Sequence, residues 1–125
     1  MKIKDKIPGE QLDIKYIKGL TKKIEKTLNP NNLESLEMWK ELKRINKKTA
    51  IDYYKKNKQQ KYYMLYTVYG KNETNYIFLT NKDDIIKFID NEFDEEYDEG
   101  FDIIITDIEF KKIIMGNHDG ILVTR

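Results

Sequence analysis

The side chains best able to do chemistry are the carboxylates of an acidic tract, residues 90–102. Eight of these thirteen residues are acidic, so the tract could bind a basic protein surface or a Ca²⁺ ion, or be only a solvated loop. Its spacing does not match an EF-hand loop, and no carboxylate pair stands out as a glycosidase acid and base. Phe93, Tyr97 and Phe101 recur every four residues, which predicts that aromatic packing anchors the tract with its carboxylates outward. The candidate partner-binding residues are Asp90, Glu92, Asp94, Glu95, Glu96, Tyr97, Asp98, Glu99 and Asp102.

A second candidate is the string GNHDG at residues 116–120, which contains His118. It is similar to the GNHD element of calcineurin-like metallophosphoesterases, in which Asn and His hold metal and phosphate. The DxH and GDxxD motifs of that family are absent, and a dinuclear site needs several His and carboxylate ligands. Gly, Asn and Asp tolerate positive φ, so we interpret the string as a hairpin turn.

The composition removes most other catalytic chemistry. The chain has no cysteine and one histidine, which excludes disulfide scaffolds, thiolate nucleophiles, cysteine zinc sites and most multi-histidine sites. We therefore assign no catalytic residue, no metal and no cofactor, and we expect a binding protein rather than an enzyme.

Charge is divided unequally between the two halves of the chain. Residues 1–62 contain 17 Lys and Arg against 8 Asp and Glu, a balance of +9, whereas residues 63–125 have a balance of −8. Lysines beside strand tyrosines are typical of surfaces that bind phosphates and stack bases. This pattern supports an alternative, a direct nucleic-acid-binding surface on the basic half. The other interpretation is that the lysines form only a solvated helix face. The alternative residues are Lys43, Arg44, Lys47, Lys48, Lys55, Lys56, Tyr62 and Tyr66.

Helices are expected to dominate the basic half. Residues 1–11 carry a Pro-Gly turn signal and no sustained periodicity, which favours a flexible or edge-pairing arm. Apolar residues at helical spacing predict a first helix over 12–28, although its beginning could instead be a short strand. The string NPNN then predicts the start of a long helix, with Asn29 as cap and Pro30 in the first turn. The apolar face of that helix is Leu33, Leu36, Trp39, Leu42 and Ile45, continuing to Ala50 and Tyr53.

Strands are expected to dominate the acidic half. Residues 61–70 and 75–80 are rich in aromatic and β-branched side chains and predict an antiparallel hairpin. Thr80 or Asn81 should cap a helix that ends near Phe93. Strand character returns at residues 103–110 and on both sides of the GNHDG turn. Neither face of the first strand is plainly polar, so either both faces are covered or one meets a partner.

These elements predict one α+β domain over residues 1–125, with N-terminal helices followed by a small antiparallel sheet and one intervening helix. Within it we expect an arm at 1–11, a basic helical part at 12–58, and at 61–125 a β-hairpin, a helix, the acidic ridge and a C-terminal hairpin. No apolar run is long enough to span a bilayer, and residues 1–11 lack the apolar block of a secretory signal. We expect a cytoplasmic protein without a membrane partner, and host bacterial cytoplasm if a phage encodes it.

The order of elements in residues 64–102 is strand, turn, strand, capped helix and acidic ridge. This order resembles small phage anti-CRISPR proteins, in particular type II inhibitors whose acidic surface mimics DNA and blocks the PAM-reading groove of the effector nuclease. The resemblance implies a partner-binding role for Asp94, Glu95, Glu96, Asp98 and Glu99, with Tyr97 as a packing anchor. The long basic helix is not part of that pattern, and could contact guide RNA or an acidic patch on the target.

The predicted function is a phage or mobile-element inhibitor that binds a nucleic-acid-handling protein through an acidic, DNA-mimicking surface. The expected partner is a nuclease or a nuclease–guide RNA complex, because a PAM is read by cationic side chains that a carboxylate surface can satisfy. Two alternatives stay open. One is the direct nucleic-acid binder described above, and the other is an immunity or antitoxin protein that neutralises a basic nuclease toxin.

Overall fold

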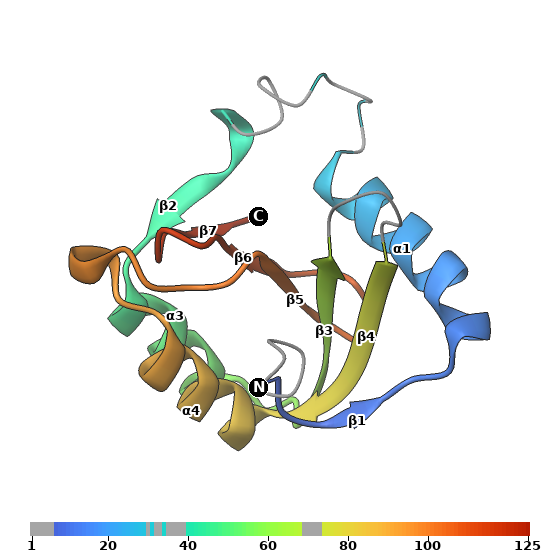
Figure 1. The fold of residues 1–125 in the computed structure, drawn as a ribbon, viewed down its shortest axis with the longest axis horizontal. Helices are drawn as coiled ribbons and strands as arrows, with labels where there is room; N and C mark the ends of the chain where they lie inside the picture. The colour runs from blue at the N-terminus through green and yellow to red at the C-terminus, as the bar shows by residue number, and fades with distance from the viewer. Residues whose placement is uncertain (1–6, 30, 32–33, 35–39, 69–73) are drawn as a thin grey trace.

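The protein is built on an antiparallel sheet, as a computed structural model describes it for residues 7–29, 31, 34, 40–68 and 74–125. Within these residues, seven strands lie in the order β1-β4-β3-β5-β6-β7-β2 (Figure 1). The strands are β1 (Glu10–Gln11), β2 (Lys43–Ile45), β3 (Lys61–Val68), β4 (Thr74–Asn81), β5 (Ile103–Asp107), β6 (Ile113–Gly116) and β7 (Leu122–Thr124). The helices of the described part are α1 (Ile14–Leu28), α3 (Lys47–Lys56), α4 (Lys82–Glu92) and a 3₁₀ turn, η2 (Glu95–Tyr97). The predicted α+β class is confirmed.

Both faces of the sheet are covered by helices. Tyr62 and Met64 of β3 belong to a core cluster that includes side chains of α3 and α4. Leu65, on the opposite face of the same strand, belongs to a second cluster with Ile24 and Leu28 of α1. Successive strand residues point to opposite faces, so the two apolar faces of this strand each pack against a helical layer. Of the two interpretations of the strand, the structure agrees with coverage of both faces.

The first and third predicted helical regions are both confirmed. The helix expected over 12–28 is confirmed as α1, which begins after Asp13, whose carboxylate accepts the Lys15 N–H at 3.2 Å. The helix expected after Asn81 is confirmed as α4, and the Asn81 side chain accepts the Asp84 N–H at 2.9 Å. The predicted ending near Phe93 is also correct.

The long second helix is only partly confirmed: Lys40 and Glu41 are helical, but the helix is interrupted. Its residues Lys43–Ile45 form β2, paired antiparallel with β7, and a new helix, α3, starts after Asn46. The Asn46 side chain accepts the Thr49 N–H at 2.7 Å, so this residue caps a helix rather than continuing one. The expected cap and face residues Pro30, Leu33, Leu36 and Trp39 lie outside the described residues.

Both predicted hairpins are confirmed by strand pairing. β3 pairs with β4 along its whole length, and β6 pairs with β7 across the turn at 117–120. Of the N-terminal arm, Glu10 and Gln11 pair with Leu79 and Phe78 at the edge of the sheet. The described helices include none long and apolar enough to cross a membrane.

Candidate binding surface at the acidic loop

The acidic loop, defined here as residues 94–102, is closed by its own backbone. Asp94 and Glu99 form an antiparallel bridge, with N–H···O distances of 2.8 Å from Asp94 to Glu99 and 2.9 Å in the reverse direction. The Asp94 carboxylate also accepts the Glu96 N–H at 3.1 Å and so caps η2. Asp98 has a φ of 53°, a conformation that Asp tolerates better than most residues. Within the loop, the turn from 94 to 99 is therefore a defined structure rather than a free chain.

Phenylalanines hold both ends of the acidic loop to the core. Phe93, just before the loop, is 1% exposed and meets Phe88 of α4 edge-on with ring centroids 5.9 Å apart. Phe101 stacks on Phe88 at 5.7 Å. Ring pairs in these arrangements add about 0.5–1.5 kcal/mol beyond the area they bury. The loop is thus tied to α4 on both sides.

Glycines bring the acidic loop against the β6–β7 turn. A methyl group on Gly120 would lie 2.6 Å from the carbonyl oxygen of Glu99, and one on Gly100 would overlap the carbonyl oxygen of Asn117. Such distances are accessible only to glycine. Two backbone segments that are distant in sequence therefore form one packed unit.

Tyr97 does not anchor the loop. It is 69% exposed, at the turn of η2, so the predicted packing role of this residue is wrong. The spacing of the aromatic residues at every fourth position suggested that all of them face the core. However, α4 ends at Phe93, and the chain turns sharply before it reaches Tyr97. Tyr97 instead stands among carboxylates on the surface.

Basic residues of the first half neutralise part of the acidic tract. Glu95 forms an ion pair with Arg44 of β2, and Asp90 lies 3.7 Å from the ammonium of Lys47 on α3. These pairs are largely exposed, and such pairs contribute about 0–1 kcal/mol each. Their effect is to cancel charge locally. Among the described residues, none forms an ion pair with Glu96, Asp98 or Glu99, which are exposed.

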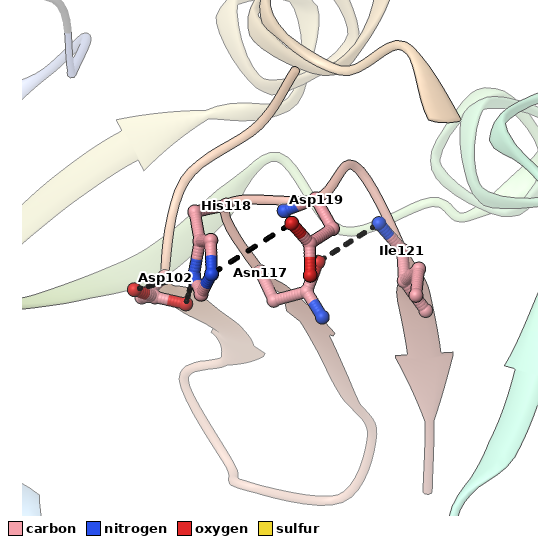
Figure 2. A network of polar contacts seen from close by, with 5 residues as sticks. All are labelled: Asp102, Asn117, His118, Asp119 and Ile121. Carbon is pink, nitrogen blue, oxygen red and sulfur yellow. Dashed lines mark hydrogen bonds and ion pairs between the residues drawn. The ribbon is translucent and has the colours of Figure 1, made fainter. Parts of the chain in front are cut away.

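The single histidine closes a polar network at the side of the loop (Figure 2). The Nδ1 atom of His118 lies 3.3 Å from the carboxylate of Asp102, and its Nε2 lies 3.7 Å from that of Asp119. The Asn117 side chain accepts the N–H groups of Asp119 and Ile121 at 2.9 and 3.0 Å. Asn117 therefore shapes a turn, in agreement with the interpretation of GNHDG as turn chemistry.

The His118 network predicts a measurable titration. The hydrogen bond with Asp102, followed by its negative charge and that of Asp119, raises the pKa of His118 above its ordinary value of about 6.5. Because the folded pKa is the higher one, the charged form stabilises the protein below pH 6.5, and this contribution is lost as pH rises through the folded pKa. In NMR titration, Asp102→Asn should lower the pKa of His118 more than Asp119→Asn does. Equal shifts, or none, would contradict the network.

The tyrosines of the alternative nucleic-acid surface are not free to stack on bases. Tyr62 is 1% exposed and meets Tyr54 edge-on at 5.1 Å, and its hydroxyl donates to the Gln59 carbonyl at 3.1 Å. Burial raises the pKa of Tyr62 to about 12. Tyr66 is half-buried and stacks on Tyr76 at 6.5 Å. The prediction that Tyr62 presents its ring to a ligand is therefore wrong, because α3 and α4 cover this face of β3.

The cations of that alternative are separated by the break in the predicted helix. Arg44 and Lys47 pair with acidic residues, as described above, and the others are exposed on β2 and α3: Lys43, Lys48, Lys55 and Lys56. For metal binding, the described residues contain no group of three or more His, Cys, Asp or Glu side chains that could hold an ion.

The sequence does not predict the pairing of the acidic tract with Arg44 and Lys47, because this pairing depends on the strand β2, which interrupts the expected long helix. The charge division itself was a signal, since opposite charges in two halves of one chain can meet when it folds. Comparison with protein-family models, curated proteins and solved structures finds no match. The geometry of the acidic loop is thus the basis on which a function can be argued.

Proposed function

We propose that the protein binds a basic surface of a nucleic-acid-handling protein through the tip of the acidic loop, and inhibits it. The tip is defined as residues 96–99: Glu96, Tyr97, Asp98 and Glu99. The target that this chemistry fits best is a type II CRISPR effector nuclease, whose PAM-reading groove is cationic. The chain would then be a phage or mobile-element inhibitor, and its action needs no catalysis.

The observation that carries the proposal is an exposed tyrosine held among three carboxylates without cationic partners in the described part of the chain. Tyrosine is enriched among the residues that dominate binding energy. The bridge between Asp94 and Glu99 already orders the turn, so docking loses little conformational entropy there.

The proposed contact is smaller than the whole acidic tract. Asp90 and Glu95 have cations beside them, so their fields are partly cancelled at short range, and the Asp102 carboxylate is engaged by His118. A groove that binds phosphates would therefore meet the negative potential of the tip. This restricts the DNA-like surface to a few charges and favours one narrow cationic site on the partner.

The test compares wild type with the tip variant Glu96→Gln/Asp98→Asn/Glu99→Gln. The probe is a purified type II effector loaded with guide RNA, and the readout is its binding to duplex DNA that contains the PAM. Wild type should compete with the duplex, and the tip variant should compete at least about 30-fold less well, since removing one partner of a desolvated charge pair costs about 2–5 kcal/mol. Asparagine tolerates the φ of residue 98, so the turn should persist.

A matched control removes three carboxylates elsewhere, with Glu10→Gln, Glu34→Gln and Asp52→Asn. It changes net charge equally and should compete as wild type does. If both variants lost competition equally, net charge alone would explain the effect. If wild type did not compete with the duplex, the effector would not be the target. Affinity capture from a nuclease-treated lysate then tests the alternative of an immunity protein. Such a protein would retain a basic nuclease toxin through the same tip.

A further inference from the structure

The outer face of α1 carries a row of lysines. α1 has five lysines and one glutamate, and Lys18, Lys22 and Lys26 follow one another at intervals of four along the exposed side. At about 1.5 Å per residue, the row from Lys18 to Lys26 is about 12 Å long. One nucleic-acid strand carries a charge about every 3.4 Å, so this row matches the length of about four phosphates.

The described carboxylates do little to neutralise this row. In the described part of the chain, no ion pair involves Lys18, Lys22 or Lys26. The nearby Glu109 is held by Lys111, with the carboxylate and ammonium 2.8 Å apart. The hydrogen bond from Lys111 lowers the pKa of Glu109. The face of α1 therefore keeps its positive potential.

A depression of about 460 Å³ lies at the C-terminal end of the row. It is lined by Lys23, Lys26, Thr27, Ile108, Glu109 and Phe110. Phe110 stacks on Tyr63 at 5.7 Å, and the ammonium of Lys23 lies 5.7 Å from the Phe110 ring centroid. Ile108 is 46% exposed, so the depression joins an apolar floor to cationic sides.

The turn that presents Phe110 is held in an unusual conformation. Phe110 has a φ of 59°, which is rare for an aromatic residue and has a steric cost. Asp107 supports the turn, since its buried carboxylate accepts the N–H groups of Lys111 and Lys112 at 2.7 and 3.1 Å. Its carbonyl accepts the Phe110 N–H at 3.1 Å. Strained positions of this kind concentrate at binding sites.

From this arrangement we infer a second binding site, for single-stranded nucleic acid. Phosphates follow Lys18, Lys22 and Lys26, and one base enters the depression against the exposed side chain of Ile108. Lysine rows combined with an aromatic or apolar surface for a base are typical of proteins that bind single strands. An acidic protein segment would use the lysines but has no equivalent need for the apolar floor.

The site lies apart from the acidic loop. α1 packs in the cluster with Leu65, whereas Phe93 belongs to the cluster on the other face of the sheet. Figure 1 shows α1 at the right and the orange turn of η2 at the left edge. The inference does not depend on the proposed function, and each can fail alone.

The test is fluorescence anisotropy with a labelled oligothymidylate of about 12 nucleotides, titrated at salt concentrations from about 50 to about 200 mM. Wild type should bind with a strong salt dependence. Lys22→Gln/Lys26→Gln should weaken binding and flatten the slope of log K against log salt by about 1.4, because each phosphate contact on a single strand contributes about 0.7. Ile108→Asp should weaken binding about tenfold through loss of the base contact.

The matched control is Lys58→Gln/Lys61→Gln, where the chain passes from α3 into β3, which removes the same charge from exposed side chains elsewhere and should bind as wild type does. Equal weakening by both double variants, or no binding by wild type at about 50 mM salt, would overturn the proposal. Poly-L-glutamate of equal charge serves as competitor. If it displaced the oligonucleotide as well as unlabelled oligothymidylate does, the surface would be one for acidic proteins and the inference would be wrong.

Discussion

Phe93→Ala should lower the free energy of unfolding by about 3–5 kcal/mol, the usual cost of removing a buried aromatic ring. Phe93 is 1% exposed and contacts Phe88, and a methyl group on Gly116 would overlap its ring. Urea denaturation monitored by circular dichroism would measure the change.

Tyr97→Ala is the control within the same tract. Tyr97 lies four residues further along and is 69% exposed, so its removal should change stability by less than about 0.5 kcal/mol. The two variants should separate further in function, since Tyr97→Ala should impair binding to the effector while the fold is retained. Similar losses of stability in the two variants would mean that Tyr97 is packed against the core rather than exposed.

Gly120→Ala should be destabilising by about 2–5 kcal/mol. Gly120 has a φ of +82°, and a methyl group there would lie 2.6 Å from the Glu99 carbonyl oxygen and 2.9 Å from that of Asp94. The left-handed conformation costs about 1–2 kcal/mol for a residue with a side chain, and forcing an atom into packed surroundings costs about 1–3 kcal/mol more. Because the opposing atoms are backbone, a rotamer change cannot relieve them.

Gly19→Ala should have the opposite sign. Gly19 lies on the exposed side of α1, and nothing lies within 4 Å of a methyl group placed there. Alanine is about 1 kcal/mol better than glycine inside a helix, so this variant should be more stable than wild type by up to that amount. If both glycine variants were equally destabilising, backbone strain at residue 120 would not be the cause.

Local sequence signals predicted the elements whose partners are close in the chain. The cap at Asn81 and the acidic first turn of α4 identified that helix. The hairpin of β3 and β4 followed from two aromatic, β-branched segments joined by a short connection. Each of these patterns is complete within about twenty residues, so no distant contact was needed to recognise it.

β2 could not be recognised in this way. Its residues Lys43–Ile45 continue a helical spacing of apolar side chains, and they become a strand because β7, about eighty residues later, offers its edge. Pairing with a distant strand overrides local preference. The same limit applies to the acidic tract, whose composition was evident but whose pairing with Arg44 and Lys47 depended on the position of β2 and α3.

The pairing of β2 with β7 can form only late in translation. β2 lies at one end of the strand order, and its only neighbour in the described sheet is β7. A ribosome adds about 5–20 residues per second, so residues 43–45 wait several seconds before residues 122–124 exist to pair with them. During that interval Arg44 is not yet fixed near Glu95. The nascent chain therefore exposes a basic segment without its strand partner, and a chaperone or a nucleic acid can contact it.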